Sequence, residues 1–366
     1  MQWKNDLTQI LGIDYPVIQG PMLAVTTPEM VAAISNKGGL GSLPVGGLSP
    51  QQTAVLIRKT KTLTNKPFAV NLFAHNIPAI DKQQVEDMQQ FLEKVCNQNK
   101  IPFEKQSSES LRFYSYNEQV QILLDENIPV VSFTFGVLND EAIKIFKEKG
   151  VVLIGTATCV KEAVVLDEKG IDVITAQGAE AGGHRGTFLK DEPLPMIGLM
   201  SLIPQLLSHL DKPVIAAGGI NSGKSIKASF VLGAKGVQIG TAFIGSDESA
   251  AISSYKTAIQ NASETDTVIT RAFTGRWGRA IKNKFIEEVE NSGMVIPDYP
   301  VQGGLVVPIR NFAQQHDAKD FIPLFAGQSL WRSEGQPAGE IFTQLIRQAE
   351  ETENDQLHHS ALPLKN

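Results

Sequence analysis

The feature that most limits how this chain can fold is a series of eight short apolar runs, separated by helical patterns, in its first 250 residues. The runs are short, mostly apolar and often β-branched, which is typical of parallel strands covered on both faces. They lie at residues 17–20, 41–44, 68–73, 130–135, 151–155, 172–175, 214–217 and 236–240. Eight such units predict an α/β fold, a (β/α)8 TIM barrel, whose ligand site lies at the carboxyl ends of the strands.

Helix signals between the runs agree with this prediction. A capping residue followed by proline, Thr27-Pro28, begins one helical pattern, and residues 222–232 form another in a later connection. A doubly wound sheet is the structural alternative. Its first turn would carry G-x-G-x-x-G, whereas the first turn here, residues 19–22, reads QGPM.

Two longer segments interrupt the alternation. Residues 76–118 form a polar insertion, largely helical in pattern, after the third strand. A longer insertion follows the eighth strand, and residues 337–351 then have the pattern of a capped amphipathic helix that closes the barrel. We therefore expect residues 1–250 plus 336–366 to form the barrel, and residues 251–335 to form an inserted helical, lid-like subdomain at the substrate site.

Composition argues against several classes of function. The formal net charge is −6 at pH 7, so no basic excess is present to neutralise nucleic-acid phosphates. No apolar run approaches the ~20 residues that span a bilayer, and the first residues lack the pattern of a signal peptide. Cys96 and Cys159 are too few for a disulfide framework, and neither C-x-x-C nor H-E-x-x-H occurs, so no metal site is predicted. We expect a soluble, cytoplasmic monomer or homodimer without nucleic-acid or membrane partners.

Glycine-rich turns follow three of the predicted strands at their carboxyl ends. The first, residues 176–186, surrounds His184 with small residues and reads AQGAEAGGHRG. The second contains Gly218 and Gly219, and the third contains Gly240. Because the residues of these turns have small side chains, their backbone can lie close to a large flat ligand. The sequence therefore predicts a ligand site where the three turns meet, with the histidine directed at it.

The second and third turns have the features of a phosphate site. Loops after strands seven and eight of such barrels often hold phosphate, and a helix that starts near Ser222 adds the positive end of its dipole. The alternative is that the glycines only let helices pack closely on strands. Glycine in both loops favours phosphate binding. The residues concerned are Gly218, Gly219, Gln238, Ile239, Gly240 and Thr241.

Two carboxamides are placed to meet the edge of a flat ring. Asn71 lies towards the end of the third strand and Gln177 follows the sixth, and a carboxamide both donates and accepts hydrogen bonds. Gly20, Pro21 and Met22 could lie along the face of the ring, although Met22 is equally suited to fill the core. Either amide could instead hold a loop in place. Taken with the phosphate loops, the two amides favour a flavin.

The ordered set of these motifs resembles the nitronate monooxygenases, formerly called 2-nitropropane dioxygenases, in their histidine-bearing class. The likeness covers most of the chain, including QGPM at 19–22, VNLF at 70–73, QGAEAGGHRG at 177–186, AGGI at 217–220 and QIGTAF at 238–243. Trp277-Gly278 departs from the family pattern. The resemblance implies an FMN-dependent barrel with His184 in the active site and flavin contacts at Asn71, Gln177, Gly182, Gly219 and residues 238–241.

The resemblance also implies a reaction. Alkyl nitronates, with propionate 3-nitronate as the natural substrate, would be oxidised by O2 to a carbonyl compound and nitrite, in a detoxification that passes through a flavin semiquinone. His184 would hydrogen-bond the nitro oxygens, or abstract the α-proton of a neutral nitroalkane, for which an unperturbed pKa of ~6.5 is suited. A histidine that only stabilises its turn is the alternative.

Other residues are secondary candidates for the site. His75 follows the third strand near the predicted mouth, and Tyr299 and the arginines of residues 271–279 could meet an anionic substrate. Arg185 and Glu180 are expected to pair and shape the histidine-bearing turn.

Two other functions stay open at this point. FMN-dependent NAD(P)H reductases of the enoyl-ACP or quinone type resemble the same barrel, and rapid consumption of NADH or NADPH would favour them. Arg185 after His184, and the run at residues 327–329, favour nitronate oxidation instead. A non-enzymatic flavin-binding protein would bind FMN and be inert towards nitronates, pyridine nucleotides and quinones.

Overall fold

The computed structural model describes residues 2–189, 193–330 and 335–360, with side chains described up to residue 351. Its central sheet has eight parallel strands in the order β1-β9-β8-β6-β5-β4-β3-β2. A parallel bridge between Ile18 and Leu40 brings the first strand beside the second, so the sheet is a nearly closed barrel. The predicted (β/α)8 TIM barrel is confirmed. The strands are β1 (Val17–Gln19), β2 (Gly41–Pro44), β3 (Phe68–Phe73), β4 (Val130–Thr134), β5 (Val152–Ala157), β6 (Val173–Gln177), β8 (Val214–Ala217) and β9 (Gly236–Ile239).

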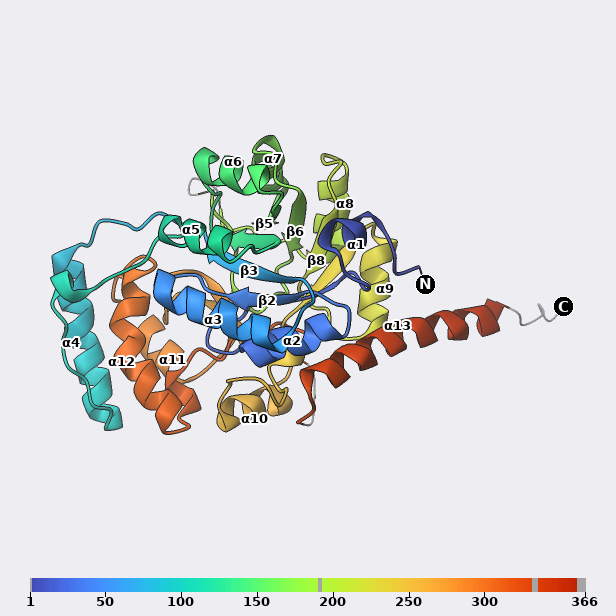
Figure 1. The fold of residues 1–366 in the computed structure, drawn as a ribbon. Helices are drawn as coiled ribbons and strands as arrows, with labels where there is room; N and C mark the ends of the chain where they lie inside the picture. Colours follow the sequence, from blue (N-terminus) through green and yellow to red (C-terminus); the bar gives the residue numbers. More distant parts are fainter. Residues whose placement is uncertain (1, 190–192, 331–334, 361–366) are drawn as a thin grey trace.

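Helices cover the outside of the barrel between successive strands (Figure 1). At the start of the first of them, the Thr27 side chain accepts a hydrogen bond from Met30 N, and Pro28 occupies the first turn. The last helix, α13 (Ala338–Ser360), packs against α2 (Pro28–Asn36) and α9 (Gly223–Val231). The helix predicted at residues 337–351 therefore closes the barrel. The helices are α2 (Pro28–Asn36), α3 (Pro50–Leu63), α5 (Asn117–Asp125), α6 (Asp140–Glu148), α7 (Val160–Glu168), α8 (Leu199–Leu207), α9 (Gly223–Val231) and α13 (Ala338–Ser360).

An apolar cluster fills the amino-terminal end of the barrel. Strand residues such as Ile18, Val173 and Ile215 pack with Leu7 of α1 (Asp6–Leu11), and each of these side chains is at most 2% exposed. Because α1 and this cluster close the amino-terminal end, the carboxyl ends of the strands are the end where a ligand can enter.

A second apolar core lies outside the barrel, and both insertions contribute to it. Met88 and Leu92 of α4, from the insertion after β3, pack in it with Phe285 and Ile309 from the segment after β9. Figure 1 shows α4, α11 and α12 on the same side of the barrel. The segment after β9 carries two strands, so it is not purely helical as predicted. Its role as a lid stays a prediction. The elements are α4 (Lys82–Asn99), η1 (Ser108–Ser110), η2 (Thr241–Phe243), α10 (Ser253–Asn261), β10 (Thr267–Thr270), β11 (Gly278–Ile281), α11 (Lys284–Glu290), α12 (Val301–Gln315) and η3 (Lys319–Phe321).

A small antiparallel sheet joins this segment to the histidine-bearing turn. β7 (Gly183–His184) pairs with β11, and β11 pairs with β10. Gly278 lies opposite His184, and Arg185 N donates to the Trp277 carbonyl at 2.8 Å. The backbone around the candidate histidine is therefore fixed by a strand that lies far away in the sequence.

Candidate active site

His184 lies at the carboxyl ends of the barrel strands, in the turn that follows β6. Its Nε2 is 2.8 Å from Thr274 Oγ1. Three aromatic rings surround the imidazole, those of Phe325, Phe135 and Tyr299, at centroid distances of 4.8, 5.5 and 6.1 Å. The predicted histidine is thus positioned by a hydroxyl on one nitrogen and enclosed by aromatic side chains.

The charge state of His184 follows from these surroundings. Burial lowers its pKa to about 3, and the positive charges of Arg276 and Arg310 act in the same direction. The imidazole is therefore neutral at physiological pH, with one ring nitrogen able to donate a hydrogen bond and the other able to accept one. It is also a weaker base than an exposed histidine.

The two arginines supply positive charge beside this ring. The Arg276 guanidinium lies 4.1 Å from the centroid of Phe135 and donates to the carbonyls of Arg185 and Thr187. Arg310 Nε is buried and has no hydrogen-bond partner in the described structure. Burial lowers the pKa of Arg276 to about 10, so the side chain keeps its charge at neutral pH. Within the described residues neither arginine forms an ion pair with a carboxylate. Glu162 acts on Arg276 from farther away, and no carboxylate is among the groups that act on Arg310, so the two cations suit an anion.

Residues after β3 and β4 complete the enclosure. Phe135 has φ 76, a left-handed conformation that is uncommon for a bulky residue, and its ring lies 4.6 Å from Phe73 and 5.5 Å from Tyr299. Burial, with the charge of Arg276, lowers the pKa of His75 to about 4, and burial raises the pKa of Tyr299. Backbone strain of this kind gathers at ligand sites. The candidate site therefore combines neutral imidazoles, a neutral phenol and two cations.

The two predicted carboxamides both have protein partners. Gln177 Nε2 donates to the His184 carbonyl at 2.9 Å, and Gln177 Oε1 accepts from Gly186 N at 2.8 Å. Asn71 Nδ2 donates to Ser132 Oγ at 3.0 Å. Gln177 therefore holds the histidine-bearing turn, which is the loop-holding role given above as the alternative to a ligand contact. The predicted contacts of both amides with a flavin stay a prediction.

Arg185 also shapes this turn, although differently from the expected pairing with Glu180. Its side chain is fully buried and donates to three backbone carbonyls, those of Gln177, Gly178 and Pro195. Glu180 accepts instead from Leu199 N at 2.9 Å. Gly182, in the same turn, packs so closely that an added Cβ would lie 2.5 Å from the Ala326 carbonyl carbon.

A buried carboxylate supports the arginine side of the site. Glu162 is 0% exposed and accepts four hydrogen bonds, two from Thr158, one from Thr187 Oγ1 at 2.6 Å and one from Phe188 N at 2.7 Å. The carbonyl of Thr187 in turn accepts from Arg276. Glu162 therefore fixes the segment on which this guanidinium rests.

The second and third glycine turns meet the histidine-bearing turn. Gly218 and Gly219 have φ 128 and 63, and a Cβ on Gly218 would lie 2.9 Å from Ala181 N. Thr241 Oγ1 accepts a hydrogen bond from Gly327 N at 3.0 Å. The structure therefore brings the three turns together at one end of the barrel, as the sequence indicates.

The backbone at Gly240 leaves room for a side chain that the glycine does not have. A Cβ added there would have a single neighbour within 4 Å, Met22 Sδ at 3.7 Å. Gly20 N donates to the Ile239 carbonyl at 2.7 Å, which joins the turns after β1 and β9. The turns after β1 and β9, both predicted to contact the cofactor, therefore meet at small residues, and such residues fit the close approach of a flavin. Half-buried residues of these two turns include Pro21, Met22 and Gln238.

Sequence reasoning missed several residues of this site. Phe135 and Arg310 were not singled out, and Glu162 lies in a helix with an ordinary pattern. A glycine or asparagine after β4 would have indicated a left-handed residue, but a phenylalanine gives no such signal. Arg310 lies on the helix α12, where only the three-dimensional fold shows that it faces His184.

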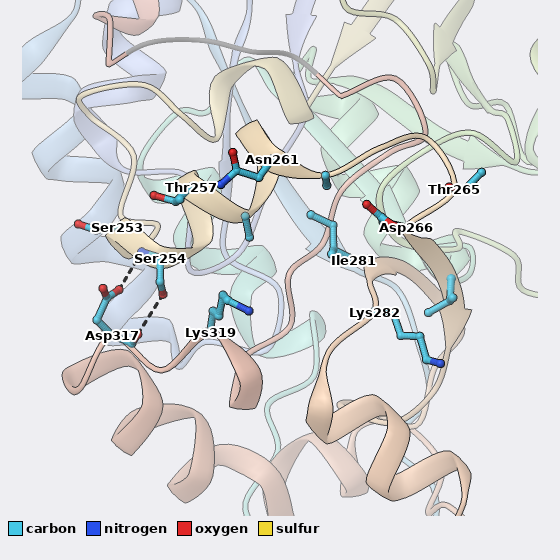
Figure 2. A pocket seen from close by; sticks show the side chains of 13 residues that line it. Ser253, Ser254, Thr257, Asn261, Thr265, Asp266, Ile281, Lys282, Asp317 and Lys319 are labelled. Carbon is cyan, nitrogen blue, oxygen red and sulfur yellow. Dashed lines mark hydrogen bonds between the residues drawn. The ribbon is translucent and has the colours of Figure 1, made fainter.

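A separate surface hollow of about 690 Å³ lies between α10, the β10–β11 pair and η3 (Figure 2). Ser254 N and Oγ donate to the side chain and carbonyl of Asp317 at one end of it. None of the predicted site residues lines this hollow. Within the described part of the chain, no helix is long and apolar enough to cross a membrane, and no cluster of three metal-ligating side chains occurs.

The fold and motifs agree with those of known proteins. The family model for nitronate monooxygenase matches residues 4–348. A probable nitronate monooxygenase from Staphylococcus aureus strain MRSA252 is 42% identical over 346 residues, which cover 94% of this chain and 97% of that protein.

Two solved structures share the fold. The nitroalkane oxidase from Streptomyces ansochromogenes has a TM-score of 0.83 and 32% identity, over 96% of this chain and 99% of that one. FabK from Thermotoga maritima has a TM-score of 0.75 and 26% identity, over 98% of this chain and 100% of that one. Together with the buried histidine at the carboxyl ends of the strands, these matches show that the chain is a flavin-type oxidoreductase that belongs to the nitronate monooxygenase family.

Proposed function

We propose that this protein uses FMN to oxidise alkyl nitronates with O2, giving a carbonyl compound and nitrite. The observation that carries the proposal is the neutral imidazole of His184 beside two guanidiniums that form no ion pair with a carboxylate among the described residues. A nitronate is an anion, and buried positive charge without a protein counterion favours an anionic ligand.

FMN would be held by the three glycine turns. The phosphate would lie at Gly218, Gly219 and Thr241, and the ring would lie along the turn Gly20-Pro21-Met22, next to Gly240. When bound, FMN supplies the capacity to take up one electron at a time and pass it to O2. The protein residues around it bind, orient and shield the substrate.

His184 would orient the reacting group. With Nε2 beside Thr274 Oγ1, the ring position is fixed, and the neutral imidazole can hydrogen-bond a nitro oxygen. A pKa of about 3 makes this histidine a poor acceptor for the α-proton of a neutral nitroalkane. The protein should therefore use preformed nitronates far better than neutral nitroalkanes.

The charge balance favours a nitronate with a second negative group. One nitronate charge would compensate one of the two guanidiniums, Arg276 and Arg310, and a carboxylate elsewhere in the same substrate would compensate the other. Propionate 3-nitronate has both groups. We therefore propose it as the preferred substrate, with detoxification as the role.

Oxygen consumption and nitrite release test this proposal. The FMN-loaded protein should consume O2 and release nitrite with propionate 3-nitronate, and should turn over NADH and NADPH far more slowly in the presence of enoyl thioesters or quinones. The reverse order of rates would support the reductase alternative. An FMN-loaded protein inert to all of these substrates would support the binding-protein alternative.

A further inference from the structure

His75 has unused hydrogen-bonding capacity inside the site. The residue follows β3 by two positions and is 9% exposed. Both of its ring nitrogens are buried and lack a partner at full hydrogen-bonding geometry in the described structure, although the Phe73 backbone lies near enough to raise the pKa of the ring slightly. Buried polar groups are nearly always paired, and leaving one unpaired costs about 1–3 kcal/mol. The ring is therefore placed for a partner that the described protein residues do not supply.

The side chains around His75 indicate where such a partner would lie. Its ring centroid lies 4.7 Å from Tyr299 and 6.5 Å from Phe135. The same two rings border His184, at 6.1 and 5.5 Å. Two imidazoles thus flank one aromatic pair, and the charge of Arg276 acts on both of them.

We propose that His75 is a second substrate-binding residue, which donates an N–H hydrogen bond to an acceptor group remote from the nitro group held beside His184. The inference rests on the proposed nitronate oxidation. It names a substrate class, short nitronates with a carboxylate at the far end, and assigns His75 the recognition of that carboxylate next to the charge of Arg276.

A neutral imidazole suits this role. Burial and Arg276 hold the pKa of His75 at about 4, so at neutral pH the ring carries one donor N–H. It can therefore bind an anion without adding a third cation to a site that already contains two guanidiniums. Arg276, whose charge acts on His75, supplies the positive charge beside it.

The inference is tested with two His75 variants, one control variant and two nitronates of similar size. In His75→Phe, KM for propionate 3-nitronate should rise about 10- to 100-fold, because a hydrogen bond to a charged group is lost. The KM for propyl-1-nitronate, which has no carboxylate, should stay within about twofold, as should kcat for both. His75→Gln, which keeps a donor, should recover part of the loss. His209→Phe, at an exposed histidine, serves as the matched control.

Binding measurements separate this inference from the proposed activity. Succinate resembles propionate 3-nitronate in shape and charge and undergoes no oxidation, so calorimetry with the FMN-loaded protein reports recognition alone. Wild type should bind succinate more tightly than butyrate, and His75→Phe should abolish that preference. The expected preference for succinate does not depend on turnover. A protein that shows this preference but oxidises no nitronate would overturn only the proposed function.

Three results would overturn the role of His75. One is an equal loss for both nitronates. Another is no succinate preference in wild type. The third is loss of FMN from His75→Phe with the substrate preference unchanged, which would assign the ring to the cofactor. Because the variant removes unpaired buried nitrogens and keeps an aromatic ring, its melting temperature should equal or exceed that of wild type.

Discussion

The two ends of the barrel contain different kinds of residue. At the amino-terminal end, Leu7 and Leu11 pack on Ile18, Val173 and Ile215 in a cluster made only of apolar side chains. The carboxyl end instead carries two histidines, two arginines and a buried tyrosine, grouped with other aromatic rings. One end therefore supplies stability, and the other carries polar groups whose burial is unfavourable unless a ligand meets them.

Truncation at the amino-terminal end should have the largest effect, and on stability alone. Leu7→Ala removes a fully buried side chain and should cost about 2–5 kcal/mol in the free energy of unfolding. Denaturant unfolding measures this loss. The kcat/KM of the folded variant should match wild type, and a large fall in kcat/KM would show that the two ends are not independent.

His184→Asn should have the opposite pattern. The turnover of nitronates should fall by about 100-fold or more, because the group that orients the nitro oxygens is shortened and displaced from Thr274. The FMN content, read from its absorbance, and the melting temperature should stay close to wild type. Full activity in this variant would leave His184 as a residue that only stabilises its turn.

Arg276→Met should weaken substrate binding by about 10- to 100-fold, because a buried charge that faces the anion is removed. Steady-state kinetics should show most of this change in KM. The same variant should raise the pKa of His184, since the charge of Arg276 holds it down. Arg276→Lys keeps the positive charge and should bind the substrate more tightly than Arg276→Met. Equal affinities of the two variants would show that the shape of the guanidinium, and not its charge, determines binding.

Glu162→Gln tests the support beneath that arginine. An amide nitrogen would replace one of the oxygens that accept from Thr158, Thr187 and Phe188, at a cost of about 2 kcal/mol in unfolding free energy. Thermal denaturation should detect it. Glu148→Gln, at an exposed ion pair with Lys144, should change stability by less than about 0.5 kcal/mol.

A comparable effect concerns the pH dependence of stability. The pKa of His75 lies near 4 in the folded protein, below its ordinary value, so the unfolded chain binds more protons between the two values. The contribution of this group to stability is therefore complete above pH ~6.5 and is lost as the pH falls towards 4. Melting temperatures at pH 7.5 and 5 should differ less in His75→Phe than in wild type. An equal difference would show that His75 is not buried in its neutral form.

The barrel itself could be predicted because its signals are local. Each strand is a short, mostly apolar run, and the caps at Thr27 and Ser222 stand directly before their helices. The predicted glycine turns lie together because the carboxyl ends of parallel strands meet at one end of a barrel.

The remaining parts of the site depend on contacts between distant residues. β7 has two residues and exists because β11 pairs with it. Arg276, Tyr299 and Arg310 reach His184 only after the segment beyond β9 has packed against the barrel. The left-handed backbone of Phe135 is imposed by its surroundings, where Gly136 packs so closely on Ala74 that an added Cβ would lie 1.9 Å from the carbonyl oxygen.

An anaerobic titration of the FMN-loaded protein with propionate 3-nitronate tests the central claim most directly. Our account predicts that the nitronate alone bleaches the absorbance of oxidised flavin, and that O2 restores it with release of nitrite. It also predicts that His184→Asn binds the same amount of FMN and bleaches much more slowly. An oxidised spectrum that stays unchanged with nitronates, but is bleached by NADH or NADPH, would contradict the account.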